Sequence, residues 1–175
     1  LQEAGLPFEI IEKNETVGGT WFENGYPGCG VDTPNHFFSF SFAPNHDWPE
    51  HFSKRNELWA YLERIADSYG LRAHIRFNTE VTTARYDAAR ALWLVEMKDA
   101  EGRITRREVN ALVTAVGQLN RPAIPDIGVL ADFAGPKFHT GHWDHGQTVE
   151  GKRVAMIGTG ASGMQTGPSI APDVE

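Results

Sequence analysis

Val154-Ala-Met-Ile-Gly-Thr-Gly-Ala-Ser-Gly163 is the stretch of sequence that decides the fold. A short apolar run leads into three glycines, Gly158, Gly160 and Gly163, with the spacing G-x-G-x-x-G. Such a turn between a strand and a helix lets backbone N–H groups approach a pyrophosphate at the N-terminus of the helix. The pattern predicts a dinucleotide site on an α/β fold, although similar turns also occur in proteins that bind no nucleotide.

A second fixed pattern lies just before this turn, in Phe133-Ala-Gly-Pro-Lys-Phe-His-Thr-Gly-His-Trp-Asp144. Phe133, Gly135, His139 and Trp143-Asp144 have the spacing F-x-G-x-x-x-H-x-x-x-W-D. This segment resembles the fingerprint of the Baeyer-Villiger monooxygenases, which are class B flavoprotein monooxygenases. Two ordered motifs at fixed spacing rarely arise by chance, so the resemblance is specific.

The stretch 28–44 resembles most closely the 4-hydroxyacetophenone monooxygenase branch of the same family, and three segments near the start of the chain resemble the family in general. They are Phe8-Glu-Ile-Ile-Glu12, Val17-Gly-Gly-Thr-Trp21 and Tyr26-Pro-Gly-Cys-Gly-Val-Asp32. From the residues alone, the first is a short strand that ends on an acid, and the second lets backbone approach a flat ligand closely. The alternatives are a solvated strand end and a turn in which Trp21 belongs to the core.

On the FAD side, the resemblance implies a role for each motif. Glu12 would bind the adenosine ribose, and Val81 is expected to contact the cofactor as well. Asp32 would lie beside the isoalloxazine and the nicotinamide and act in catalysis by steadying an arginine. His139 of the fingerprint is the second residue expected to be catalytic. The flavin side would be lined by Gly18, Gly19, Thr20 and Trp21.

On the NADPH side, the resemblance implies contacts from the glycine turn to the phosphates. The residues expected to make them are Gly158, Thr159, Gly160, Ala161, Ser162 and Gly163. No residue that would select NADPH over NADH can be placed, so the choice of NADPH comes from the resemblance alone.

The implied fold is α/β, with two dinucleotide-binding domains of the Rossmann type, each only partly present. We expect an FAD-binding domain over residues 1–120, without its N-terminal glycine loop. A linker carrying the fingerprint is expected over 121–150 and a truncated NADPH-binding domain over 151–175. Both ends of the chain therefore look cut. Strand-like segments at 92–97 and 104–109 predict a β-hairpin inserted in the FAD-binding domain.

Local patterns predict several further elements. A helix is expected from a Ser53 N-cap to Gly70, and buried strands are expected at Ala111–Gly117 and Lys152–Ile157. Pro168 and Pro172 predict a kink or an early stop in the helix after the glycine turn. An aromatic stripe is expected to pack in the core, namely Phe37, Phe38, Phe40 and Phe42.

Composition excludes several classes of function. With 16 basic and 23 acidic residues the formal charge is −7, and no basic tract favours nucleic acid or an anionic membrane. No apolar run approaches the roughly 18 residues of a membrane span, so a cytoplasmic location is expected. Cys29 is the only cysteine, which excludes a disulfide framework. His139, His142 and His145 invite a metal site, but no carboxylate or cysteine cluster completes one, and none is predicted.

The resemblance implies that the intact protein uses NADPH to reduce FAD. The reduced flavin captures O₂ as a C4a-peroxide, which inserts one oxygen into a ketone to give an ester or lactone; an aryl ketone is only weakly suggested. One alternative is a flavin-containing monooxygenase acting on nitrogen or sulfur, whose fingerprint usually lacks the ending seen at Trp143-Asp144. Another is a noncatalytic nucleotide-binding fragment. We expect the 175 residues alone to be inactive.

Overall fold

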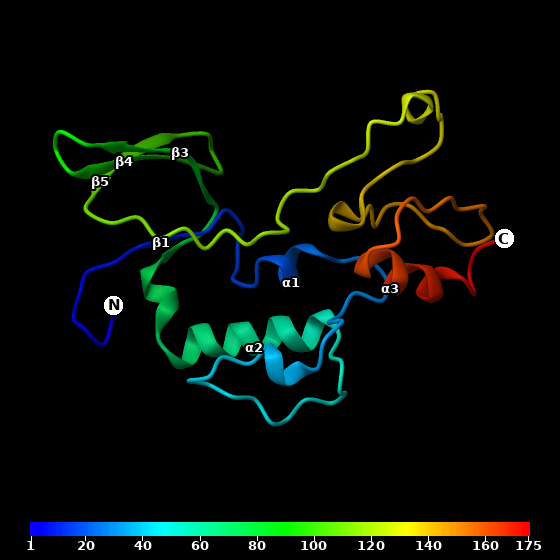
Figure 1. Ribbon diagram of the computed structural model, residues 1–175, viewed down its shortest axis with the longest axis horizontal. Coiled ribbons are helices and arrows are strands. Elements are labelled where there is room, and N and C mark those ends of the chain that lie inside the picture. The colour runs from blue at the N-terminus through cyan, green and yellow to red at the C-terminus, as the bar shows by residue number, and fades with distance from the viewer. The chain divides into compact units, whose positions relative to one another are not determined.

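The computed structural model describes residues 1–175, which divide into two compact units (Figure 1). The first unit comprises Leu1–Val17 and Leu62–Val116, and the second comprises Gly18–Tyr61 and Gly117–Glu175. Each unit is therefore built from two separate stretches of chain. The sequence predicts a division into three consecutive segments, at 1–120, 121–150 and 151–175. That division into domains stays a prediction.

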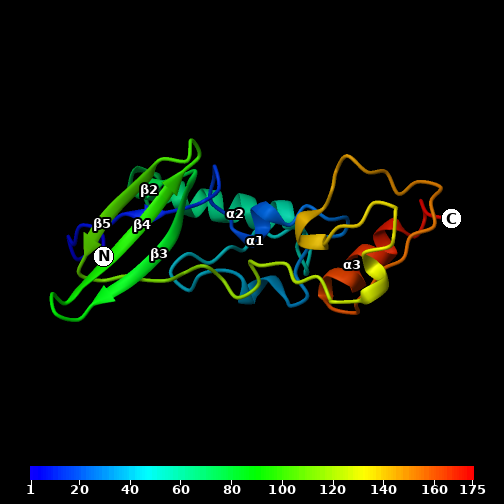
Figure 2. The same cartoon turned by 90° about the horizontal axis from the view of Figure 1, so that it is seen from above.

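The first unit contains a three-stranded antiparallel sheet of β3 (Thr79–Asp87), β4 (Leu92–Asp99) and β5 (Ile104–Val109), in that spatial order (Figure 2). Along the central strand β4, Val95 and Met97 are buried and face the same side, as the two-residue period of a strand requires. Strands β4 and β5 lie at the two strand-like segments from which a hairpin was expected.

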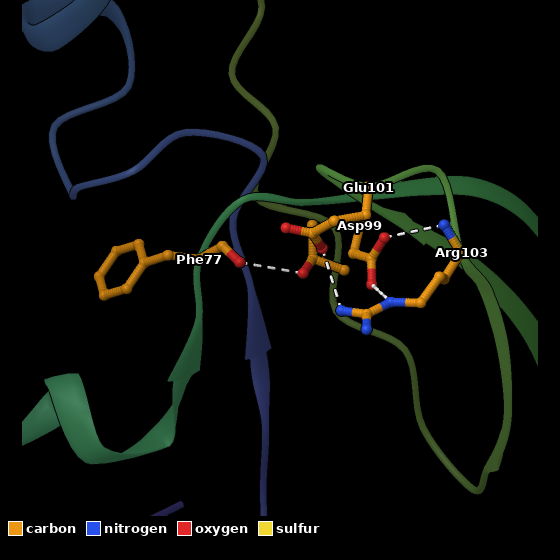
Figure 3. Close-up of polar contacts among 5 residues, drawn as sticks. Phe77, Asp99, Glu101 and Arg103 are labelled. Atoms are coloured by element: carbon orange, nitrogen blue, oxygen red, sulfur yellow. Dashed lines mark hydrogen bonds and ion pairs between the residues drawn. The ribbon is translucent and has the colours of Figure 1, made fainter.

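The turn between β4 and β5 is held by side chains that the local sequence supplies (Figure 3). The Asp99 carboxylate accepts hydrogen bonds from the Arg103 backbone N–H at 2.8 Å and from its guanidinium at 2.6 Å. Arg103 also pairs with Glu101 at 3.0 Å. Hydrogen bonding to Arg103 holds the pKa of Asp99 below its usual range. Because these charges are exposed, the ion pairs define the turn more than they stabilise the fold.

A short parallel pair also belongs to the first unit. Strand β1 (Ile10–Ile11) pairs with β2 (Ile75–Arg76), and the Glu12 N–H continues the ladder by donating to the Arg76 carbonyl at 3.0 Å. Strand β1 is shorter than the expected strand Phe8–Glu12, because only these residues find a hydrogen-bonding neighbour.

The helix expected after residue 53 is α2 (Arg55–Ser68), with Leu58, Tyr61 and Ala66 buried on it at helical spacing. The prediction that Ser53 caps this helix is wrong, because the Ser53 hydroxyl is buried without a hydrogen-bond partner. Its backbone is bound elsewhere: the N–H donates to Asn35 Oδ1 at 2.7 Å and the carbonyl accepts from Val31 N at 3.0 Å.

The predictions of strands at Ala111–Gly117 and Lys152–Ile157 are wrong for this structure, in which both segments are irregular and, apart from the half-buried Leu112, exposed. Val113 and Val116, for example, are 80% and 72% exposed. An apolar run becomes a buried strand only where neighbouring strands bond to it on both sides, and neither segment has such neighbours among these residues.

The second unit contains two helices of its own besides the start of α2. They are α1 (Thr20–Glu23) and α3 (Ala161–Ile170), and α3 contains Pro168 and ends two residues before Pro172. Short 3-10 turns lie at Asn35–Phe37, Leu71–His74, Gly128–Leu130 and Thr140–His142, of which only the second belongs to the first unit. No helix in the structure has both the length and the apolar character needed to cross a membrane.

The aromatic stripe after Asp32 is not a core, which contradicts the prediction. Phe37 is 81% exposed, and Phe40 and Phe42 stack on each other at 5.1 Å while remaining exposed. Phe38 is half-buried and meets the edge of the Trp21 ring at 5.7 Å. Phe38, Phe40 and Phe42 thus have aromatic neighbours, whereas Phe37 lies largely in solvent.

Candidate active site

The glycine turn before α3 has the openness that a phosphate-binding turn needs. A β-carbon on Gly158 or Gly160 would meet no atom within 4 Å, so the backbone there faces open space. A β-carbon on Gly163 would instead lie 2.9 Å from the Gly158 carbonyl oxygen, which shows how tightly α3 packs on the turn. Gly160 is the N-cap of α3 and supplies no side-chain cap, so the first N–H groups of the helix are open to a ligand.

The predicted flavin-side turn is held by α2. A β-carbon on Gly18 would lie 2.7 Å from the Trp59 ring, whereas Gly19 faces open space. Arg55 lies over the Trp59 ring at 5.2 Å and donates from Nη2 to the carbonyl of Phe22 in α1. Gly18 therefore gives close packing, and Gly19 leaves backbone open to a flat ligand. The Trp21 ring, half-buried against Phe38, is neither wholly core nor free.

The loop Tyr26–Asp32 is bound to α3 by one side chain, that of Gln165. Gln165 Nε2 donates to the Gly30 carbonyl at 2.9 Å. Gln165 Oε1 accepts from the Gly30 N–H at 3.3 Å and from the Tyr26 hydroxyl at 2.9 Å. Gly28 lies against the same helix, since a β-carbon there would overlap the Ser169 hydroxyl and lie 2.5 Å from the Gln165 carbonyl oxygen.

Two ionisable groups in this loop are shielded from water. Burial raises the pKa of Tyr26 to about 12, against the opposing hydrogen bond with Ser162. Burial also raises the pKa of the Cys29 thiol, although the hydrogen bond with Tyr26 and the charge of Arg55 act in the other direction. Both side chains are consequently neutral at physiological pH.

We expect the Cys29 thiol to react slowly with alkylating reagents in the folded protein. It is 5% exposed, and its raised pKa lowers the fraction of reactive thiolate at pH 8. With iodoacetamide at that pH, the native full-length protein should alkylate at Cys29 at least about tenfold more slowly than the same protein in urea, as followed by peptide mass spectrometry. Equal rates in the two states would contradict the buried position.

Asp32 ends this loop with a free carboxylate. The side chain is exposed and forms no hydrogen bond or ion pair within the chain, whereas the preceding Val31 is buried and donates its N–H to the Ser53 carbonyl at 3.0 Å. A fixed backbone with an unpaired charge is suited to act on a group outside these residues.

The fingerprint segment is a compact loop in which each defining residue has a structural role. A β-carbon on Gly135 would lie 2.5 Å from the Phe133 ring, so these two residues of the fingerprint lie in contact. The Trp143 ring meets the Phe138 ring edge-on at 5.0 Å. Asp144 Oδ1 accepts from the Gly146 N–H at 2.9 Å and so closes the next turn.

His139 is fixed by its own backbone neighbour. Its Nδ1 accepts from the Gly141 N–H at 3.0 Å, which caps the 3-10 turn at Thr140–His142. A ring that accepts through Nδ1 and is neutral carries its proton on Nε2. His139 can therefore present a hydrogen-bond donor through Nε2.

The fingerprint loop also contacts the chain just after α1. A β-carbon on Gly25 would lie 2.7 Å from the His145 ring, and one on Gly141 would lie 3.4 Å from Asn24 Oδ1. The His145 ring thus packs against Gly25. The second unit brings the flavin-side turn, the Asp32 loop, the fingerprint and the glycine turn into one compact body.

Two of the predicted site residues belong to the first unit. Glu12 is half-buried after β1, and its Oε1 accepts from the Asn14 N–H at 2.8 Å, which fixes the carboxylate with acceptor capacity to spare. Val81 lies in β3 beside a register shift and is exposed. All the others belong to the second unit.

Sequence reasoning missed two residues that organise this site, Gln165 and Arg55. Gln165 bonds to residues more than 130 positions earlier, so no local pattern reveals the contact. Its place one turn after Ser162, on the same face of the helix, was the available signal. Arg55 could have been noticed as a cation at the start of a helix, which is an unfavourable place for it unless it bonds elsewhere.

Open backbone at Gly19 and at the glycine turn, together with the uncapped start of α3, is the arrangement that a dinucleotide ligand needs. The chain belongs to the flavin-binding monooxygenase-like family, whose profile matches residues 5–173. The chain is 46% identical over its whole length to a Baeyer-Villiger monooxygenase of Streptomyces coelicolor, of which it covers 33%. It is 42% identical, over 98% of its length, to a Baeyer-Villiger monooxygenase of Pseudomonas aeruginosa, of which it covers 32%.

Solved structures give the same likeness in three dimensions. The crystal structure of OTEMO in complex with FAD and NADP matches 99% of this chain and 34% of its own, with a TM-score of 0.87 and 36% identity. Cyclohexanone monooxygenase from Rhodococcus sp. Phi1 bound to NADP⁺ matches 99% of this chain and 33% of its own, with a TM-score of 0.83 and 38% identity. The fold is therefore that of these flavoproteins, and the chain spans about a third of the length of its relatives.

Proposed function

We propose that the whole protein is a Baeyer-Villiger monooxygenase, which uses FAD, NADPH and O₂ to convert a ketone into an ester or lactone. The observation that carries the proposal is that one compact unit holds the flavin-side turn, the Asp32 loop, the fingerprint and the glycine turn. Two relatives with that name, at 46% and 42% identity, support it.

In this proposal each part of the site has a defined task. The glycine turn and the first turn of α3 offer N–H groups to the pyrophosphate of NADPH, with the Ser162 and Thr159 hydroxyls beside them. Gly19 leaves room for the flavin to approach the backbone, and Glu12 binds the ribose of FAD. When bound, FAD supplies the redox and oxygen chemistry.

Two side chains then act on the reacting groups. Asp32 places a negative charge beside the flavin and the nicotinamide, where it orients a cationic partner. His139, through Nε2–H, donates a hydrogen bond from the fingerprint loop. Neither group needs to change its protonation to do this, because both act by position and charge.

The finer parts of the proposal concern domains, substrate and location. Residues 1–120, 121–150 and 151–175 are assigned to an FAD-binding domain, a linker and the start of an NADPH-binding domain, with the β4–β5 hairpin as an insertion in the first. Cyclohexanone-bound and ε-caprolactone-bound structures of cyclohexanone monooxygenase match this chain, which supports a ketone substrate. The proposal also takes an aryl ketone as the substrate and the cytoplasm as the location of the protein.

The test is an assay of the full-length protein. Purified protein should be yellow, oxidise NADPH faster when a ketone is added, and form the ester or lactone, as detected by gas chromatography. We use cyclohexanone and 4-hydroxyacetophenone as the probes. A colourless protein would support a noncatalytic role, and a yellow one that makes only sulfoxides or N-oxides would support the other flavin-containing monooxygenases.

Within that assay, His139→Ala should lower ketone-dependent turnover by about 10- to 100-fold, because the loop loses both its cap and its Nε2 donor. His142→Ala, three residues away on an exposed side chain, is the matched control and should stay within about twofold of the parent. Equal losses of turnover in the two variants would show that His139 has no specific role in the site.

A further inference from the structure

Gln165 is the only side chain of α3 that hydrogen bonds to the loop preceding Asp32 through both of its functional atoms. Its amide bonds to the N–H and the carbonyl of the same residue, Gly30, as a neighbouring strand would. Because the Gly30 N–H can only donate and its carbonyl can only accept, the orientation of the Gln165 amide is determined. A glutamate could not donate to the carbonyl, and an apolar side chain would satisfy neither atom.

The Tyr26 hydroxyl extends this contact toward the glycine turn. It donates to Gln165 Oε1 at 2.9 Å and also hydrogen bonds with Ser162 in the first turn of α3. Tyr26 is 7% exposed, so water does not compete for these bonds. The phenol therefore lies between a residue of the proposed phosphate-binding turn and the residue that holds Gly30.

The loop has little freedom to move independently of α3. Gly28 is in contact with the Gln165 carbonyl and the Ser169 hydroxyl, and that hydroxyl donates to the same carbonyl at 2.8 Å. Val31 is buried between Gly30 and Asp32. A shift of α3 must therefore be followed by the backbone that carries the Asp32 carboxylate.

We infer that Gln165 is a positioning residue that couples dinucleotide binding at the glycine turn to the position of Asp32. The inference rests on the proposed function, since it takes the turn as the NADPH site. A pyrophosphate held by the N-terminus of α3 fixes the helix, and Gln165 transmits that constraint to Gly30 and so to Asp32. The coupling lies wholly within the second unit.

The test follows backbone protection of the loop when NADP⁺ binds. Hydrogen–deuterium exchange is measured on the full-length flavoprotein, in the peptide that covers residues 26–32, with and without NADP⁺. In the parent protein NADP⁺ should slow exchange in this peptide by about tenfold. In Gln165→Met, which keeps the side-chain length and removes the amide, NADP⁺ should still bind, and the protection should fall to within about twofold of the unbound protein.

A matched control makes the same chemical change elsewhere. Gln147→Met removes a side-chain amide of the second unit that forms no hydrogen bond, and protection of residues 26–32 by NADP⁺ should be unchanged in this variant. If Gln165→Met does not load FAD, Tyr26→Phe carries the test, because it removes one of the three hydrogen bonds of Gln165, together with the bond to Ser162, and keeps the ring. Protection should then be reduced but measurable.

The outcomes separate this inference from the proposed function. Full protection in Gln165→Met, or in Tyr26→Phe where that variant carries the test, overturns the coupling, and so does NADP⁺ binding to the parent protein without protection of residues 26–32. Failure of the parent protein to bind NADP⁺ at all overturns the proposed function and the inference with it. Loss of protection with NADP⁺ still bound supports both.

Discussion

Replacing Gly28 by alanine should destabilise the full-length protein by about 2–5 kcal/mol. The backbone at Gly28 has φ +80°, which costs an L-residue about 1–2 kcal/mol, and the new β-carbon would overlap the Ser169 hydroxyl and the Gln165 carbonyl. Overpacking of this kind costs about 1–3 kcal/mol more, because helix or loop must move. The measurement is the free energy of unfolding in urea, with the melting temperature as a second readout.

Gly102→Ala is the control that separates the two causes. Gly102 has φ +81°, almost the same as Gly28, but a β-carbon there would meet no atom within 4 Å. It should cost only the backbone strain, about 1–2 kcal/mol. If the two variants lose the same stability, the contact between Gly28 and α3 is absent.

Gly163→Ala should weaken NADPH binding by about tenfold or more while FAD stays bound. The added β-carbon would lie 2.9 Å from the Gly158 carbonyl oxygen, which belongs to backbone and cannot rotate away. The turn must open, and its N–H groups leave the positions from which they reach a pyrophosphate. The measurement is the dissociation constant for NADP⁺ together with KM for NADPH.

Gly167→Ala provides the comparison one turn further along α3. Its β-carbon would meet only the terminal methyl of Met156, at 3.1 Å, and that flexible side chain can move. Because alanine favours a helix over glycine by about 0.5–1 kcal/mol, this variant should bind NADP⁺ normally and be as stable as the parent or more so. Equal weakening in both variants would show that the helix, not the turn, is sensitive.

The parts of the fold that sequence predicted well are those determined locally. The helix α2 follows from apolar residues at helical spacing, and the β4–β5 pair follows from turn chemistry at Asp99–Arg103. The strands expected at Ala111–Gly117 and Lys152–Ile157 are not formed, because a strand depends on partners that its own residues do not encode.

The candidate site likewise contains residues that local motifs indicate and residues that only the folded structure reveals. The motifs predict that the glycine turns, Asp32 and His139 belong to the site, and this stays a prediction; close backbone approach explains the spacing of the glycines. They did not reveal Gln165, whose amide bonds to residues more than 130 positions away, or Arg55, whose guanidinium reaches the carbonyl of Phe22. Such contacts depend on the folded arrangement, which no short pattern contains.

For the proposed monooxygenase, the burial of Cys29 has a consequence for oxidation of the protein itself. Monooxygenases that release hydrogen peroxide expose their own sulfur atoms to oxidation, and the thiolate is the form that peroxide attacks on the way to sulfenic and sulfinic acids. Cys29 lies three residues before Asp32, yet its sulfur is enclosed and its raised pKa keeps it protonated. In the proposed enzyme the loop would thereby keep its packing under conditions that oxidise a more accessible thiol.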